Sequence, residues 1–408
     1  MEVTEIDRLA LKLRPHYSHF ASRRPDEVLL TGHSHQAWPD VAREGQLAAW
    51  DDAARLVDGK WDTVFSEVIP QLADRIAERL GSSRPNDLAF APNTHELVYR
   101  LLSCFPPNAR VLTTDSEFHS LARQLRRAEE DGLQVTRVPV EPGEGFADRM
   151  IAALREGSFE LVALSQVFFT TSRLVTRLTD ILEVAAEHDI PVLVDVYHAY
   201  CALPLSCDEL PGTTFVTGGG YKYAQCGEGS CFMLLPADAT RFRPRQTGWF
   251  ADFSNLAAGS AEVGYGPGGQ RFWGATFDPT PFYRALHVMR WMDRLGLSSS
   301  VLREASLLRT EAIIELWARD RLDEAGLHLA SPRDPVARGG FVAFEHPEAG
   351  RLSSALRARG IHTDVRGNLL RLGPAPYTQA AGIERAMNVL GDLVRGSASN
   401  GAAGARLA

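Results

Sequence analysis

Short apolar runs rich in β-branched residues alternate with amphipathic stretches over much of the chain. Between residues 86 and 195, the runs DLAFAP, ARVLTTD, QVTRVPV, ELVALS and IPVLVD are separated by segments with the spacing of helices. Just before them, Leu72, Ile76 and Leu80 recur on one helical face, and Gly81 follows. This strand–helix alternation predicts an α/β fold, with a mostly parallel mixed sheet between helices.

The pattern changes after about residue 290, where longer helices flank a few short strands. The runs GGFVAFEH, IHTDV and NLLRLGP are predicted as strands, with helices over 300–326 and up to Leu393. This predicts a smaller α+β domain after the sheet domain. The predicted division is residues 1–60 as an N-terminal segment contributing to the small domain and the site, 61–290 as the large domain, 291–395 as the small C-terminal domain, and 396–408 as a disordered tail.

One stretch of the large domain carries the candidate chemistry. Asp195 closes the run IPVLVD, His198 follows, and Lys222 comes after a further strand-like run, between Tyr221 and Tyr223. Ligands of open α/β sheets bind beyond the carboxyl ends of strands. An aspartate at a strand end and a lysine 27 residues later suit pyridoxal phosphate chemistry. The lysine amine forms a Schiff base and shuttles a proton at the substrate Cα, and the carboxylate keeps the pyridine nitrogen protonated.

Each of these residues alone also has an ordinary structural explanation. An aspartate that ends a strand often caps a turn or helix, and a lysine in a glycine-rich loop is usually a solvated charge. The triplet Gly218-Gly219-Gly220 is a weak nucleotide-loop candidate, since the chain lacks GxxxxGK[ST] and no GxGxxG opens a helix after the first strand. The order and spacing of Asp195 and Lys222 together are more specific than either residue.

The order Asp-x-x-His, followed by a Tyr-Lys pair among small residues, resembles the fold-type I pyridoxal phosphate enzymes of the class V aminotransferase group. Within that group the chain is most similar to the kynureninase branch, over most of residues 25–392. The resemblance implies a pyridoxal 5'-phosphate cofactor bound by the large domain, and a homodimer with shared active sites. It implies catalytic roles for Lys222, Asp195, His198 and Tyr221, with the Tyr221 phenol an acid–base group or a phosphate ligand.

The same resemblance implies the other site residues. Asn93 and Thr94 match a phosphate loop at a helix N-terminus, where backbone N–H groups bind anions, and an N-cap role is compatible. Arg371 matches the arginine that binds the substrate α-carboxylate, which a planar guanidinium suits, whereas a surface strand arginine is the alternative. The further cofactor contacts implied are Phe118 against the pyridine ring (core by its pattern alone), Ser120 at the phosphate (a helix cap by its pattern alone), Ser165, Trp249 in a Gly-Trp-Phe turn, and Thr276 in a loop that reaches the partner's phosphate.

The N-terminal segment supplies further candidates. In VLLTGHSHQAWPD, the residues His33, His35 and Gln36 follow a strand-like run, where kynureninases carry a Gly-Asn-Ser segment near the substrate. His33 is predicted to bind substrate together with Arg371 and Trp273, and ordinary turn or packing roles are the alternative. No third ligand with suitable spacing accompanies the two histidines, so no metal site is predicted.

The predicted reaction is cleavage of an amino acid at its β-carbon, by C–C hydrolysis or β-elimination. Ala275 stands where kynureninases carry an asparagine that reads an aromatic amine, and a site without that hydrogen bond loses discrimination. A class V aminotransferase and a β-lyase therefore stay open, and a cofactor-binding regulatory protein is the non-enzyme alternative. A cysteine desulfurase is disfavoured, since it needs a cysteine well after the lysine and none follows Cys231.

The composition of the chain indicates in which cell compartment it works and which classes of partner it binds. The net charge of −8 and the lack of a long basic run argue against nucleic-acid binding. The N-terminus has no secretion pattern, and no apolar run approaches the ~20 residues of a membrane span. Five scattered cysteines without a CxxC pair indicate reduced thiols. A cytoplasmic enzyme acting on a small-molecule amino acid, without nucleic-acid or membrane partners, is expected.

Overall fold

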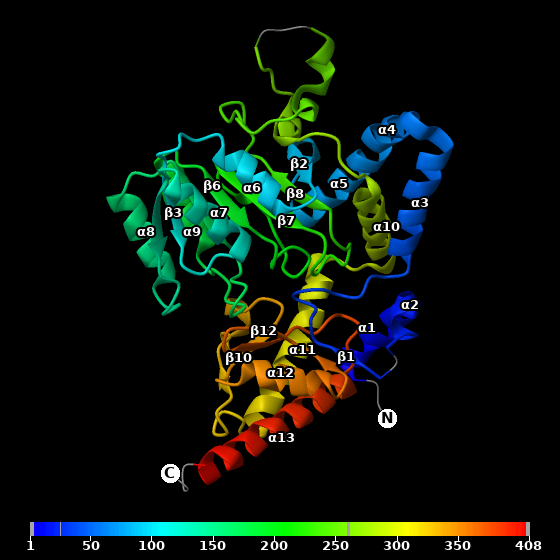
Figure 1. Cartoon of the computed structure of the whole chain (residues 1–408), viewed down its shortest axis with the longest axis vertical. Helices are drawn as coiled ribbons and strands as arrows, with labels where there is room; N and C mark the ends of the chain where they lie inside the picture. The colour runs from blue at the N-terminus through cyan, green and yellow to red at the C-terminus, as the bar shows by residue number, and fades with distance from the viewer. Residues whose placement is uncertain (1–3, 25, 259–261, 405–408) are drawn as a thin grey trace.

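The computed structural model describes residues 4–24, 26–258 and 262–404, which form a large and a small domain (Figure 1). The strands of the large domain are β2 (Leu88–Ala91), β3 (Arg110–Thr114), β4 (Gln134–Val138), β5 (Leu161–Ser165), β6 (Val192–Asp195), β7 (Thr214–Gly219) and β8 (Cys231–Leu234). They form one sheet in the order β2-β8-β7-β6-β5-β3-β4. Neighbours from β4 to β7 pair in parallel, and β8 is antiparallel to β2 and β7. The predicted fold class is confirmed.

The helices of the large domain precede, connect and follow these strands. They are α3 (Val41–Leu56), α4 (Lys60–Thr63), α5 (Ile69–Leu80), α6 (Thr94–Leu102), α7 (His119–Glu130), α8 (Phe146–Glu156), α9 (Leu178–Glu187) and α10 (Thr280–Leu295). Helices α3 and α10 lie side by side (Figure 1). Helix α5 ends as predicted, because Gly81 takes the left-handed φ of 62° that a side chain would disfavour.

The small domain combines C-terminal and N-terminal elements. Its antiparallel sheet has the order β12-β13-β10-β9, and β1 pairs in parallel with β11. The elements are α1 (Glu5–Leu13), α2 (Ser18–Ala21), β1 (Val28–Leu29), α11 (Ser299–Arg319), β9 (His328–Leu329), β10 (Val342–Glu345), α12 (Ala349–Arg357), β11 (Ile361–His362), β12 (Asp364–Arg366), β13 (Leu369–Leu372) and α13 (Ala380–Gly404). In the ranges described above, no helix is long and apolar enough to cross a membrane.

Two differences from the predicted elements concern helix ends. Helix α11 stops at Arg319 although helix was predicted to residue 326, because the chain turns there and buries Leu322 in the small core. The tail predicted to be disordered from residue 396 is helical to Gly404, since it continues α13. Residues 405–408 of that predicted tail lie outside the described part of the chain.

Two separate hydrophobic cores accompany the two sheets. The larger surrounds the seven-stranded sheet, and the smaller gathers side chains such as Ile313, Phe344 and Leu370. Val28 and Leu30 belong to the smaller core, so part of the N-terminal segment packs with the C-terminal elements. The division at residues 60, 290 and 395 stays a proposal that these two cores support.

The loop after β5 joins the domains beside the candidate site. Leu174 N donates to Ala337 O at 2.9 Å, and Gly339 N donates to Ser172 O at 2.7 Å. Phe341 N donates to Ser172 Oγ at 3.3 Å. These bonds fix this loop of the large domain against the strands of the small one.

Candidate active site

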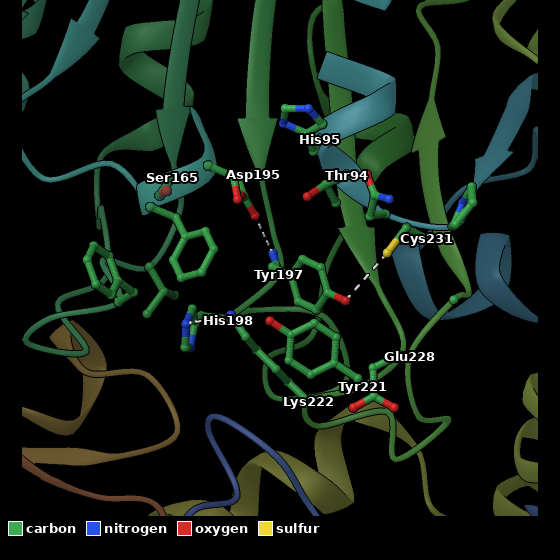
Figure 2. Close-up of a pocket in the computed structure, with 17 residues that line it drawn as sticks. Thr94, His95, Ser165, Asp195, Tyr197, His198, Tyr221, Lys222, Glu228 and Cys231 are labelled. Atoms are coloured by element: carbon green, nitrogen blue, oxygen red, sulfur yellow. Dashed lines mark hydrogen bonds between the residues drawn. The ribbon is translucent and has the colours of Figure 1, made fainter. Parts of the chain in front are cut away.

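A cavity of about 190 Å³ lies beyond the carboxyl ends of β5, β6 and β7 (Figure 2). Ser165 ends β5 and Asp195 ends β6, and the two are register partners, with Thr217 of β7 on the other side of Asp195. This is where ligands of open α/β sheets bind. The cavity is lined by Pro92, Asn93, Thr94, His95, Phe118, Ser120, Ser165, Val167, Phe169, Asp195, Tyr197, His198, Tyr221, Lys222, Glu228, Gly229 and Cys231.

Lys222 is buried in this cavity on the loop between β7 and β8. Its Nζ lies 2.8 Å from His198 Nε2, 4.5 Å from the ring centroid of Tyr197 and 5.2 Å from that of Phe118. Burial among these groups lowers the pKa of the Lys222 amine to about 7, although the charge of Asp195 opposes the shift. A large share of the amine is therefore neutral, and so nucleophilic, near pH 7.

His198 is the hydrogen-bond partner of that amine. Burial, aided by the charge of Lys222, lowers the pKa of His198 well below its usual value, so the imidazole is neutral. A neutral imidazole accepts through one nitrogen and donates through the other. Its Nδ1 is buried and has no hydrogen-bond partner among the described residues. A buried unpaired group is costly, and a bound ligand is one way to satisfy it.

Asp195 presents its carboxylate beyond the end of β6. Oδ1 accepts a hydrogen bond from Tyr197 N at 2.7 Å. Burial raises the pKa of Asp195, while the bond from Tyr197 N and the charge of Lys222 act in the opposite direction. A buried carboxylate is stabilised by a cationic partner, and a protonated pyridine nitrogen is a partner of that kind.

The opposite end of the cavity meets the N-terminus of α6. Asn93 is the N-cap of this helix, because its Oδ1 accepts the backbone N–H of Glu96 at 2.9 Å. Thr94 opens the helix, and Thr94 and Ser120 both line the cavity. The cap predicted from the pattern is therefore present, and free N–H groups of a helix N-terminus suit a phosphate. The phosphate role itself stays a prediction.

Tyr221 covers one side of the cavity next to Lys222. Its ring centroid lies 4.9 Å from that of Tyr197 and 5.0 Å from that of His35, which stacks on it (Figure 2 shows both tyrosines). Burial raises the pKa of the Tyr221 phenol to about 12, so the phenol stays protonated at neutral pH and can donate. His35 Nε2 also lies 3.6 Å from a carboxylate oxygen of Glu228, which lines the cavity.

Arg371 and His33 lie behind the cavity wall and do not line it. The buried Arg371 guanidinium donates to Phe169 O and to the Asp364 carboxylate. His33 stacks on Phe341 at 4.5 Å, with Nε2 3.5 Å from Asp364 Oδ2. Burial lowers the pKa of His33 to about 4, so this ring is neutral. Of His33 and His35, His35 is the one that contacts residues lining the cavity.

Besides Arg371 and His33, three more residues predicted at the site lie outside the cavity of this chain. Trp273 packs in the large core, 5.6 Å from Phe65 between ring centroids. Trp249 is 43% exposed and stacks on Phe250 at 4.4 Å. Thr276 is exposed on the same region of the large domain. Within one chain the structure does not bring them to Lys222, and their roles across a subunit boundary stay predictions.

Sequence reasoning missed Glu117, Tyr197 and Cys231. Tyr197 and Cys231 line the cavity, with Tyr197 Oη 3.5 Å from Cys231 Sγ. Glu117 is buried directly beneath Ser165, with Ser165 Oγ donating to its Oε2 at 2.7 Å. Tyr197 lies inside the Asp-x-x-His motif, so its place at the site could have been predicted from the sequence. Glu117 could not, because a glutamate next to a helix start is normally expected to be solvated.

The side chains that line the cavity fit pyridoxal phosphate. No group of three or more His, Cys, Asp or Glu side chains able to hold a metal ion occurs in the part of the chain that the structure describes. The cavity offers a buried lysine amine whose pKa is lowered to about 7, a buried carboxylate, an aromatic ring from Phe118 and a helix N-terminus. These are the groups needed for a carbonyl, a protonated ring nitrogen, a flat ring and a phosphate.

Comparison with known proteins supports the same assignment. The family model for the kynureninase C-terminal domain matches residues 302–390. Kynureninase of Geobacillus thermodenitrificans is 26% identical over 74% of this chain and 72% of that protein. Kynureninase of Pseudomonas fluorescens is 25% identical over 86% of this chain and 82% of its own length. The kynureninase of Burkholderia mallei is 25% identical over 90% and 89%, respectively.

Solved structures agree on the fold. A mutant of C-DES with glycine covalently linked to its PLP cofactor has a TM-score of 0.80 at 20% identity, covering 92% of this chain and 99% of that one. The apo cysteine desulfurase of Thermococcus onnurineus has a TM-score of 0.73 at 16% identity, covering 97% and 100%. The chain is therefore similar to kynureninases over most of its length and has the fold of fold-type I pyridoxal phosphate enzymes.

Proposed function

We propose that this chain is a pyridoxal-phosphate-dependent enzyme that cleaves an amino acid at Cβ, in the manner of kynureninases. The observation that carries the proposal is the state of Lys222. Its amine is buried, has a pKa lowered to about 7, forms a hydrogen bond with His198, and shares one cavity with Asp195. Titratable groups perturbed in this way inside a cavity are typical of catalytic sites. Similarity to kynureninases over most of the chain supports the reaction class.

Pyridoxal phosphate, when bound, supplies an electron sink that lets bonds at the substrate Cα and Cβ break. Lys222 Nζ removes and returns the proton at the substrate Cα, which a pKa of about 7 allows in both directions near neutrality. Asp195 holds the proton on the ring nitrogen. The Tyr221 phenol, whose pKa is raised to about 12, stays protonated and donates to the group that leaves or to the phosphate. Arg371 is the proposed α-carboxylate ligand: it does not line the cavity in this structure, but its guanidinium bonds to the main chain of Phe169, which does, so a shift of this side chain toward the cavity would bring it to the substrate.

The proposed enzyme works as a cytoplasmic homodimer. Trp249 is 43% exposed and Phe253 is 49% exposed on the same region of the large domain, which is unusual for large apolar side chains unless another surface covers them. Thr276 lies outside this chain's cavity, which fits a residue that serves the partner's site. The mass of the native protein in solution tests the dimer, and a monomer that retains full activity would contradict shared sites.

The first test is the absorbance spectrum of the purified protein with pyridoxal phosphate, before and after borohydride. The expected result is a visible band of lysine-bound cofactor that borohydride abolishes while fixing the cofactor to one peptide. The assignment is clean because the chain has few lysines, at 12, 60 and 222. Lys222→Ala should lose the band, and Lys60→Ala should keep it. Absence of any such band in the wild type would refute the proposed function.

The second test identifies the reaction by its product. Kynurenine and 3-hydroxykynurenine, supplied to the loaded protein, should release alanine and an aryl acid if C–C hydrolysis is correct. Ala275 favours one alternative, β-elimination from a substrate without an aromatic amine, since the hydrogen-bond partner that kynureninases use is missing. Release of pyruvate from a β-substituted amino acid would identify elimination. Accumulation of a keto acid together with aminated cofactor would identify an aminotransferase.

A further inference from the structure

Glu117 is a buried carboxylate that the proposed mechanism does not use. It is 5% exposed, yet no lysine or arginine side chain bonds to it among the described residues. Its partners are Thr114 at the end of β3 and Ser165 at the end of β5. Ser165 N donates to Oε1 at 3.1 Å, and Ser165 Oγ donates to Oε2 at 2.7 Å. A carboxylate kept in the interior without a countercharge is unusual.

The position of Glu117 connects it to the cofactor side of the cavity. Ser165 lines the cavity and is the register partner of Asp195 in the neighbouring strand. Phe118, the next residue along the chain, lines the cavity as well. Glu117 therefore lies one hydrogen bond behind a serine that lines the cavity, and close enough to Asp195 for their charges to repel.

The hydrogen bonds to the two carboxylate oxygens are not equivalent. Oε1 receives two donors, Ser165 N and Thr114 Oγ1, the latter at 2.7 Å. Thr114 Oγ1 itself accepts from Ser116 N at 3.2 Å, which directs its own hydrogen toward Glu117. Among the described residues, Oε2 has one hydrogen-bond partner, Ser165 Oγ. A proton added to Glu117 therefore belongs on Oε2, between the carboxyl group and the serine.

A serine hydroxyl has one hydrogen to donate. When Glu117 is ionised, that hydrogen points to Oε2, and Ser165 Oγ offers only lone pairs to the cavity. When Oε2 carries a proton, the carboxyl group donates to Ser165 Oγ, and the serine hydrogen is free to point at the ligand. We propose that Glu117 is a positioning residue that sets whether Ser165 donates or accepts a hydrogen bond toward the bound cofactor.

Both states of Glu117 are accessible near neutral pH. Burial raises the pKa of Glu117 to about 7, against the bonds from Ser165 and Thr114, and the negative charge of Asp195 adds to the increase. Asp195 on β6 is the charged group that faces it from a neighbouring strand, and Lys222 acts on that aspartate in turn. A cofactor that places positive charge beside Asp195 should weaken the repulsion and favour ionised Glu117.

This inference rests on the proposed cofactor, so the experiment measures cofactor binding before any activity. The dissociation constant for pyridoxal phosphate and the circular dichroism of the bound cofactor are recorded from pH 6 to pH 9. The variants are Glu117→Gln, Ser165→Ala and the double variant. In Glu117→Gln the amide oxygen takes the place of Oε1 and the NH₂ donates to Ser165 Oγ, which fixes the protonated arrangement.

The expected result in the wild type is a transition at or somewhat below pH 7, additional to the Lys222 titration that all variants share. This additional transition should disappear in Glu117→Gln, whose dichroism should match the acid form of the wild type. Ser165→Ala should also abolish it, and the double variant should match Ser165→Ala within about twofold in affinity. If Glu117 has only a structural role, the losses of cofactor affinity in the two single variants should add in the double variant, and the transition should be unchanged in Glu117→Gln. That outcome would overturn the inference while leaving the cofactor assignment intact.

A second variant guards against a folding defect in Glu117→Gln. Thr114→Val keeps Glu117 and Ser165 but removes one bond to the charged carboxylate, so the transition should move to higher pH. An unmoved transition in Thr114→Val would also count against the proposal. A wild type that binds no pyridoxal phosphate at any pH would overturn the proposed function, and the inference with it.

Discussion

Replacing Lys222 with methionine is expected to stabilise the cofactor-free protein by an amount that depends on pH. The pKa of the amine falls from 10.5 to about 7 in the folded chain, mainly because burial disfavours the charged form. Between these two values the unfolded chain binds a proton that the folded chain does not, so the free energy of unfolding rises with pH. Methionine is unbranched, apolar and adaptable, and it removes the titration.

The size of the stabilisation follows from the difference between the two pKa values of the amine. At about 1.36 kcal/mol per pH unit, the span from 10.5 to about 7 corresponds to about 5 kcal/mol. Below pH 7 the folded wild type bears this whole cost, and above pH 7 the cost declines. The advantage of methionine should therefore shrink by about 2 kcal/mol between pH 7 and pH 9, because half of the amine is already neutral at pH 7. Loss of the hydrogen bond to His198 offsets about 1 kcal/mol at every pH.

Urea unfolding of the cofactor-free wild type and Lys222→Met, at several values from pH 6 to pH 9, measures this difference. Lys12→Met, at an exposed lysine, is the matched control, and its stability relative to the wild type should stay constant with pH. The test rests on how the stability difference between the two proteins changes with pH, because a change in packing alters this difference by the same amount at every pH. An advantage of Lys222→Met that is constant from pH 7 to pH 9 would refute the argument that burial sets the pKa of the amine.

Four further substitutions have defined outcomes. Asp195→Asn should weaken pyridoxal phosphate binding at least about tenfold, since the ring nitrogen loses its anionic partner, and equilibrium dialysis that finds unchanged affinity would contradict the assignment. Arg371→Lys should raise KM for the amino acid about tenfold, because an ammonium lacks the planar fork of a guanidinium. Cofactor affinity should change little. Steady-state kinetics with the amino acid and with pyridoxal phosphate varied in turn measures the two effects. Gly269→Ala should lower the free energy of unfolding by about 2 kcal/mol, because its Cβ would lie 2.2 Å from the Leu88 carbonyl. Gly350→Ala, with open space around it in helix α12, should instead stabilise by about 0.5–1 kcal/mol, and calorimetry separates the two.

The strands of the large domain could be predicted because their signal is local. A parallel strand is covered on both faces, so a run such as IPVLVD is apolar at nearly every position. The end of α5 was equally visible, because Gly81 tolerates the left-handed backbone that stops a helix. The end of α11 was not visible, since the helical pattern continues beyond Arg319. Burial of Leu322 in the small core accompanies the turn there.

The candidate site divides in the same way. Asp195, His198 and Lys222 were found from sequence because the chemistry restricts their residue types and strand ends fix their place. The roles of His33 and Trp273 depended on which distant segments meet, and the structure puts both outside the cavity wall. Whether they serve a partner subunit or a closed state is decided by contacts that spacing along the chain does not encode.

The sequence by itself determined the fold class, the order of the elements and the lysine–aspartate pair, because each depends on periodicity or on residue chemistry at a strand end. Tertiary structure alone decided that Glu117 lies under Ser165, that His35 stacks on Tyr221, and that Lys222 is buried enough to lose its proton near pH 7. These properties arise from desolvation and from contacts between segments far apart in the chain, and neither has a local pattern in the sequence.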